Sequence, residues 1–292
     1  MTHEPYISPK LREAIQSHLV GNLLIRDTDS PLILGVFGPP GEGKTFQINT
    51  VCNQMGINQI ILSPGELESP AQSGGGSDDP IAMLRKKYIK AGSATGSTPE
   101  GGYMNRFASA AMVINDVDTV LGDWGPKVEY SSNRQLLYGE LMSLCDFPTL
   151  VARQPVKRVP IIMTGNDASI LYAPLLRSGR MRLFKWAPTV VDKAMIVSRI
   201  FSGIPPEEIE KLIELYPDKP VAFWNDVNSR YHEDILLEWL RTRTIDDIRN
   251  DFYARREYSR RDITPHAHAP LNAIHYIADE FHKNDVRKES FL

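Results

Sequence analysis

Apolar residues along the first two thirds of the chain fall into short continuous runs separated by helical repeats. Four runs have the length and composition of buried strands: 31–37, 58–62, 111–114 and 159–163. Residues 183–186 favour one more strand. Between these runs, apolar positions three or four apart predict helices, as Leu11, Ile15 and Leu19 do within 6–24. Such alternation is typical of an α/β protein with a parallel sheet.

After residue 187 the pattern becomes helical throughout. Apolar spacing predicts helices over 191–201, 206–216 and 233–240, with Thr189 and Asp192 as capping residues. From about 245 the periodicity weakens. A chain of 292 residues also exceeds the usual size of a single core. We therefore expect an α/β subdomain with an N-terminal linker helix over 1–187 and a helical subdomain over 188–292.

One stretch between the first strand and the next helix carries recognisable chemistry. It reads Gly38-Pro39-Pro40-Gly41-Glu42-Gly43-Lys44-Thr45, followed by Phe46. Its glycines allow backbone N–H groups to surround phosphates, and the helix that follows adds the partial positive charge of its N-terminus. Lys44 would reach the β- and γ-phosphates, and the Thr45 hydroxyl would ligate Mg²⁺. The stretch predicts a nucleoside triphosphate site, the alternative being a glycine-rich turn that binds nothing.

Composition and charge restrict the partners and the location. The formal net charge of −3 gives no electrostatic reason to bind nucleic acid or an anionic membrane. The N-terminus lacks the features of a signal peptide, and no apolar run approaches the roughly 20 residues that cross a bilayer. Cys52 and Cys145 form no metal or redox motif, and His266 and His268 lack nearby ligand partners. We expect a soluble, cytoplasmic protein with reduced cysteines.

The polar residues downstream narrow the class of nucleotide-binding protein. One strand ends in Asn115-Asp116, and a later strand is followed by Asn166. Two arginines, Arg177 and Arg180, come next, and the helical region follows. This order resembles the AAA+ ATPases. The resemblance implies a P-loop NTPase of the α/β class whose parallel-sheet subdomain is followed by an all-helical lid.

Several longer segments resemble one family within that superfamily, Rubisco activase. They are PLILGVFGPPGEGKTFQ, SPGELES, INDVD, VPIIMTGND, LYAPLLRSGRM and WAPT. The resemblance runs from about residue 6 to about 240. It implies an ATPase that uses ATP and Mg²⁺ to remodel Rubisco, releasing inhibitory sugar phosphates. It also implies assembly into a ring, expected to be a hexamer. The plant N-terminal extension is missing, which favours a cyanobacterial-type activase in the cytosol or carboxysome.

The resemblance also assigns roles to individual residues. Nucleotide binding falls to the phosphate loop with Phe46 and to Arg230, which resembles the sensor-2 arginine of the lid. Asp116 would activate the lytic water, and Asn166 would align that water and sense the γ-phosphate. Arg177 and Arg180 resemble arginine fingers that enter the neighbouring subunit's site. The expected metal-binding residues are Thr45, Asp116 and Asp118.

In two places the sequence departs from the usual AAA+ pattern, and two alternative functions stay open. Asn115 stands where the superfamily has an aspartate that supports Mg²⁺. Residues 66–76 and 121–130 fall where AAA+ rings place their pore loops, although the first lacks an aromatic gripping residue. One alternative is an AAA+ remodeller of another client. The other is a nucleotide-gated scaffold with little turnover.

Overall fold

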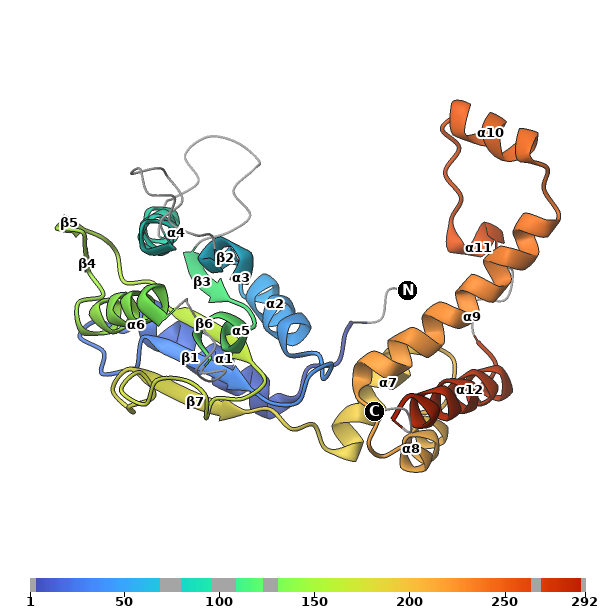
Figure 1. The fold of residues 1–292 in the computed structure, drawn as a ribbon, viewed down its shortest axis with the longest axis horizontal. Helices are drawn as coiled ribbons and strands as arrows, with labels where there is room; N and C mark the ends of the chain where they lie inside the picture. Colours follow the sequence, from blue (N-terminus) through green and yellow to red (C-terminus); the bar gives the residue numbers. More distant parts are fainter. Residues whose placement is uncertain (1–3, 69–79, 96–108, 123–130, 264–268, 290–292) are drawn as a thin grey trace. The chain divides into compact units, whose positions relative to one another are not determined.

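The computed structural model describes residues 4–68, 80–95, 109–122, 131–263 and 269–289 (Figure 1). The chain forms two compact units, one over Ile7–Ala187 and the other over Pro188–Leu292 together with the residues up to Tyr6. The sequence predicts that those first residues belong to the α/β part instead. The difference has a local cause, because the Tyr6 hydroxyl donates a hydrogen bond of 2.9 Å to Asp192 of the second unit.

The first unit is built on a parallel sheet of five strands in the order β2-β3-β6-β1-β7. The strands are β1 (Ile33–Phe37), β2 (Ile57–Leu62), β3 (Ser109–Ile114), β6 (Ile161–Gly165) and β7 (Met181–Lys185). β1 pairs with β6 on one side and β7 on the other, with Phe37 opposite both Gly165 and Lys185. All the carboxyl ends therefore meet at one edge, where ligands bind in open α/β sheets.

Six helices and a small hairpin complete the described part of this unit. The helices are α1 (Pro9–Leu23), α2 (Lys44–Gln54), α3 (Pro64–Glu68), α4 (Pro80–Ala94), α5 (Val117–Leu121) and α6 (Ser131–Asp146). The antiparallel hairpin is β4 (Leu150–Val151) with β5 (Gln154–Pro155). α4 packs against β2 and β3, and α2 packs against β2 and α1.

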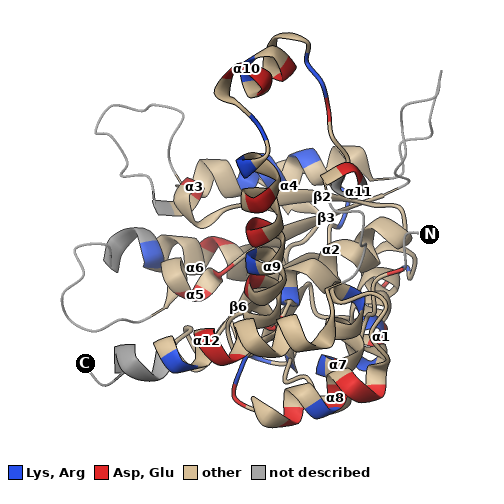
Figure 2. Cartoon of the chain, turned by 90° about the vertical axis from the view of Figure 1, so that its right-hand side faces the viewer, with Lys and Arg blue, Asp and Glu red and all other residues tan. Residues whose placement is uncertain are grey.

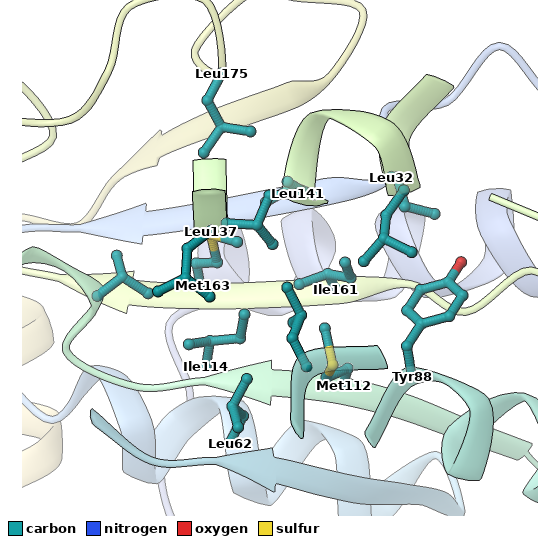
Figure 3. Packing of buried hydrophobic residues seen from close by; sticks show 14 of the residues in the cluster. Leu32, Leu62, Tyr88, Met112, Ile114, Leu137, Leu141, Ile161, Met163 and Leu175 are labelled. Atoms are coloured by element: carbon teal, nitrogen blue, oxygen red, sulfur yellow. The ribbon is translucent and has the colours of Figure 1, made fainter. Parts of the chain in front are cut away.

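A single apolar cluster fills the space between the sheet and α4 and α6 (Figure 3). Leu137 and Leu141 of α6 lie beside Ile161 and Met163 of β6. Tyr88 of α4 is fully buried, and its hydroxyl donates to the Pro148 carbonyl at 2.8 Å while accepting from the Val159 N–H at 3.2 Å. A buried tyrosine thus keeps its polar end satisfied. The continuous apolar runs in the sequence correspond to these strands.

The second unit consists of helices in the part that the structure describes. They are α7 (Val190–Ile200), α8 (Pro206–Leu215), α9 (Val221–Arg241), α10 (Ile245–Tyr253), α11 (Arg260–Ile263) and α12 (Leu271–Glu289). A second apolar cluster joins α7, α8, α9 and α12 around the fully buried Trp224. α7 begins with a capping box in which Thr189 and Asp192 exchange side-chain and backbone hydrogen bonds, so the cap expected there is confirmed.

Two helices differ from their expected bounds. α4 runs to Ala94, although the glycine, serine and threonine residues from 91 onward predict a loop. Ala91 and Gly92 are buried, and a Cβ on Gly92 would lie 2.4 Å from a Val156 methyl. α9 begins at Val221 and not near 233. Polar residues interrupt the apolar pattern in the first turns of α9, so the sequence does not predict a helix there. These turns pack into the second cluster, which stabilises them as part of the helix. In both cases tertiary contacts extend a helix beyond its local signal.

α1 carries a buried histidine that makes stability depend on pH. Nε2 of His18 lies 3.1 Å from the Ile161 carbonyl, and Nδ1 lies 3.4 Å from the Asn22 amide nitrogen. Burial, reinforced by Arg182 and Arg158, lowers the pKa of His18 from 6.5 to about 4. The folded state therefore keeps the imidazole neutral at pH values where the unfolded chain is already protonated.

We expect the free energy of unfolding to fall as the pH drops from about 6.5 towards 4, because only the unfolded state takes up the proton in that window. A shift of this size corresponds to about 3 kcal/mol. Urea unfolding at a series of pH values should show this loss for the wild type and a flatter curve for His18→Gln. His282→Gln, at an exposed position of α12, is the matched control. Equal pH dependence in wild type and His18→Gln would contradict the prediction.

Candidate active site at the carboxyl edge of the sheet

The loop between β1 and α2 has the backbone that its glycines permit. Gly41 and Gly43 have φ of 73° and 75°, in the left-handed region that favours glycine. Gly38 is needed for another reason, because a Cβ there would lie 1.8 Å from the Trp186 carbonyl oxygen. The loop is thus a concave backbone turn at the N-terminus of α2, which suits a phosphate group.

Trp186, which directly follows β7, holds this loop in place. Its indole Nε1 donates to the Glu42 carbonyl at 2.8 Å, and its backbone N–H donates to the Phe37 carbonyl at 2.7 Å. The side chain is buried. The sequence indicates no role for Trp186, whose only signal there is its place in the segment WAPT.

Lys44, the first residue of α2, lies buried in the loop. Its Nζ donates to the carbonyl oxygens of Gly38 at 2.7 Å and Pro39 at 2.9 Å, and to Oδ1 of Asn166 at 3.1 Å. Burial lowers the pKa of Lys44, while the negative charges of Asp116, Asp118 and Glu42 act in the opposite direction. The structure therefore brings the loop cation to the tips of β3 and β6.

At the tip of β3 the chain turns sharply through Asp116, which has φ 48° and ψ 47°. Its backbone N–H donates to the Thr164 hydroxyl at 3.1 Å, and its side chain is exposed and does not cap α5. Asn115 lies just before it, with Oδ1 3.3 Å from the same hydroxyl. The exposed carboxylate of Asp116 is available to a water molecule at the sheet edge, as its predicted role requires.

Asn166 follows β6, and its neighbourhood includes a buried acid. Oδ2 of Asp118 accepts the backbone N–H of Asn166 at 2.7 Å and that of Asp167 at 3.3 Å. Asp118 is only 2% exposed. Asp118 is one of the expected metal-binding residues, which stays a prediction, and the structure gives its carboxylate these backbone contacts. Sequence reasoning could not have found them, since nothing in the spacing indicates that α5 reaches the end of β6.

The residues around Thr45 fit a magnesium–nucleotide complex of the P-loop type. Thr45 is half-buried at the start of α2, while the Phe46 ring is exposed. Gln47 is buried, and its Oε1 accepts the Ser8 N–H at 3.0 Å. Within the described ranges, no cluster of three or more His, Cys, Asp or Glu residues could hold a metal by itself. A cation here would depend on Thr45, phosphate oxygens and water, as Mg²⁺ in NTPases does.

The three predicted arginines lie in different surroundings. Arg177 is exposed, and its side chain makes no hydrogen bond or ion pair with the described residues. Arg180 instead forms a two-pronged ion pair with Asp146, at 3.0 and 2.8 Å, and donates to the Pro174 carbonyl at 3.2 Å. Arg230 belongs to α9 of the second unit and pairs with Asp234 at 3.2 Å.

Several other expectations fall partly or wholly outside the described residues. His266 and His268 lie there, as do residues 69–76 and 123–130 of the two expected pore loops. The first expected loop begins inside α3, where Glu66 forms an ion pair of 2.8 Å with Lys87. Cys52 and Cys145 are free, and burial raises the pKa of both thiols to about 12. In the described ranges we find no helix with the length and apolarity to span a membrane.

These features define a P-loop nucleotide-binding protein with a parallel sheet and a helical second unit. The chain belongs to the family described as "ATPase family associated with various cellular activities (AAA)", whose model matches residues 34–188. The fold class predicted from the sequence is confirmed.

Within this family the chain is similar to Rubisco activases. It is 37% identical over 243 residues to "Ribulose bisphosphate carboxylase/oxygenase activase, chloroplastic" from Cucumis sativus, covering 80% of this chain and 55% of that protein. It is 34% identical over 252 residues to activase 1 from Nicotiana tabacum, covering 83% and 54%. The chain thus spans about half the length of these relatives. The resemblance found in the sequence is confirmed, and the cyanobacterial type stays a prediction.

Proposed function

We propose that the chain hydrolyses ATP and uses that reaction to remodel Rubisco, so that inhibitory sugar phosphates leave its active site. The observation that carries the ATPase part is the contact between Lys44 Nζ and Asn166 Oδ1 at 3.1 Å. It brings the loop cation and the strand-tip amide together at one point of the sheet edge. The names of the related proteins support Rubisco as the client.

The chain's own residues supply binding and proton handling. Lys44 and the backbone N–H groups of the loop would bind the triphosphate, and the Thr45 hydroxyl would hold Mg²⁺. ATP supplies the phosphoanhydride bond that is broken. Asp116 accepts a hydrogen bond from the attacking water and takes up the proton that the water loses, and Asn166 orients that water. Asp118, the other carboxylate near this strand tip, is buried, which leaves Asp116 as the exposed one.

The proposal includes assembly into a ring, which we expect to be a hexamer. Arg177 would enter the site of the neighbouring copy and neutralise charge that develops during phosphoryl transfer. Arg230 would contact the nucleotide from the lid. Because the site is shared, hydrolysis should depend on protein concentration. The conformational change on hydrolysis would then pass to the client.

The second unit offers an apolar surface for a protein client. Ile245, Phe252 and Tyr253 of α10 are 78%, 77% and 81% exposed, and we call this surface the α10 tip. Asp251 anchors the helix by accepting from Arg243 at 3.0 Å and from the Tyr258 hydroxyl at 2.8 Å. Figure 2 shows acidic and basic residues interspersed on α9 and α10, so neither sign of charge dominates around the tip.

Replacing both aromatic residues of the α10 tip should separate client remodelling from ATP hydrolysis. Aromatic anchors that cost 2 kcal/mol or more at interfaces correspond to about a 30-fold loss of affinity. We expect Phe252→Ser/Tyr253→Ser to keep its basal ATPase rate and to lose most of its Rubisco reactivation at limiting concentration. Leu215→Ser, at another exposed apolar position, is the control. Unchanged reactivation by the double variant would remove the α10 tip from the client interface.

The experiment that tests the proposed function measures carboxylation by Rubisco inhibited with ribulose bisphosphate. Recovery should require this chain, ATP and Mg²⁺, and should not occur with a non-hydrolysable ATP analogue. Hydrolysis without recovery would favour an AAA+ remodeller of another client. A phosphate-release assay at several protein concentrations distinguishes an ATPase from a nucleotide-gated scaffold. Such a scaffold would bind ATP with little turnover at any concentration.

A further inference from the structure

The carboxyl ends of β3 and β6 are linked by hydrogen bonds in which a side chain near each strand end contacts the backbone near the other. From β6, the Thr164 hydroxyl accepts the N–H of Asp116 at 3.1 Å and lies 3.3 Å from Oδ1 of Asn115. From the segment after β3, Asp118 accepts the N–H groups of Asn166 and Asp167. Each tip therefore has its backbone fixed by a side chain from the other. We call the pair Asp118 and Thr164 the brace.

Both members of the brace are buried, at 2% and 0% exposure. A charged hydrogen bond at 2.7 Å in such surroundings is short and strong. Gly165 makes the approach possible, because a Cβ there would lie 3.1 Å from Oδ1 of Asp118 and 2.5 Å from the Phe37 ring. A larger residue at position 165, between Thr164 and Asn166, would therefore clash with these neighbours.

We propose that Asp118 and Thr164 are positioning residues for ATP hydrolysis, fixing Asp116 and Asn166 relative to each other. This inference rests on the proposed ATPase function. The contacts support it over a metal-binding role for Asp118, because the carboxylate is buried and already accepts two backbone N–H groups. The brace holds the water-activating carboxylate at one side of the site and the water-orienting amide at the other.

Breaking the brace should lower turnover far more than nucleotide binding, since Lys44 and the phosphate loop are not part of it. A displacement of about 1 Å in a catalytic site can cost about 100-fold in rate. We expect Asp118→Asn and Thr164→Val each to lower kcat by about 10- to 100-fold with the Kd for ATP within about threefold. The double variant should be little worse than the poorer single variant, because the two side chains act as a unit.

Conservative and distant variants separate positioning from general stability. Thr164→Ser keeps the hydroxyl and should restore most of the turnover lost in Thr164→Val. Asp262→Asn is matched to Asp118→Asn, because Asp262 accepts the Ser259 N–H at 2.7 Å in the second unit. Thr242→Val is matched to Thr164→Val, since Thr242 is exposed and donates to the Trp239 carbonyl at 2.7 Å. Both controls should keep wild-type kcat.

Amide hydrogen exchange gives a readout that does not depend on activity. In Asp118→Asn the N–H groups of residues 166 and 167 should exchange faster, with the rest of the sheet unchanged. If Asp118→Asn kept the wild-type kcat and the wild-type amide exchange rates, the positioning role of the brace would be refuted. The ATPase proposal would remain intact. Recovery of the Asp118→Asn rate by excess Mg²⁺ would overturn the positioning role in favour of metal binding. Absence of turnover in the wild type would refute the proposed function and, with it, the catalytic role of the brace.

Discussion

Lys44→Ala is expected to weaken ATP binding by roughly 30- to 5000-fold. This range corresponds to the 2–5 kcal/mol that is lost when one partner of a buried charge pair is truncated. Lys44 is the only lysine or arginine between Gly38 and Thr45, so the triphosphate would lose the only cation of the loop. Titration calorimetry with ATP and Mg²⁺ measures the change directly.

Two further variants make this result specific. Lys211→Ala removes an exposed lysine from α8 and should bind ATP with wild-type affinity. Lys44→Arg keeps the charge but cannot reproduce the contacts with Gly38, Pro39 and Asn166, so it should lie between wild type and alanine. Wild-type affinity in Lys44→Ala would remove the phosphate-binding assignment from this loop.

The sequence was a good guide wherever one segment carries its own signal. The apolar runs predicted the strands because a parallel sheet covered on both faces needs continuously apolar strands. The phosphate loop was recognisable because glycine, lysine and threonine at fixed spacing have few other uses. The capping box of Thr189 and Asp192 is equally local, and it lies where the sequence placed it.

Features that depend on distant segments could not be predicted in this way. The contact of Asp118 with Asn166 joins residues that are far apart in the chain, and so does the contact of Trp186 with Glu42. The family resemblance makes Asp118 an expected metal-binding residue, and that role stays a prediction. Its burial and its contacts with the N–H groups of Asn166 and Asp167, which only the fold reveals, support the positioning role that we propose for it.

The surroundings of the two arginines after β6 could not be predicted from the sequence either. In the sequence Arg177 and Arg180 are equivalent candidates for an arginine finger. In the structure Arg180 is engaged by Asp146 of its own chain, while Arg177 extends from the surface. A residue that acts on a neighbouring copy needs a side chain that is available to it. We therefore expect Arg177 to carry most of the catalytic effect.

Arg177→Ala should bind ATP normally and lose about 10³- to 10⁵-fold in turnover, as arginine fingers do in other systems. Arg180→Ala should lose much less, and Asp146→Asn should match it, because both remove the same ion pair. Phosphate release under saturating ATP measures all three variants. Equal losses in Arg177→Ala and Arg180→Ala would mean that Arg180 leaves Asp146 when the ring assembles.

Mixing two inactive proteins tests whether the site is shared. In a ring made from Arg177→Ala and Lys44→Ala subunits, some interfaces pair an intact Lys44 with an intact Arg177 from the next copy. Turnover should therefore appear on mixing and fall again on dilution, because the shared site is lost when the ring dissociates. Mixed rings that form, as shown by native mass measurements, but hydrolyse no ATP would place Arg177 in its own subunit's site or in a structural role. Since neither parent protein can supply both residues to one interface, restored turnover has no source other than a composite site.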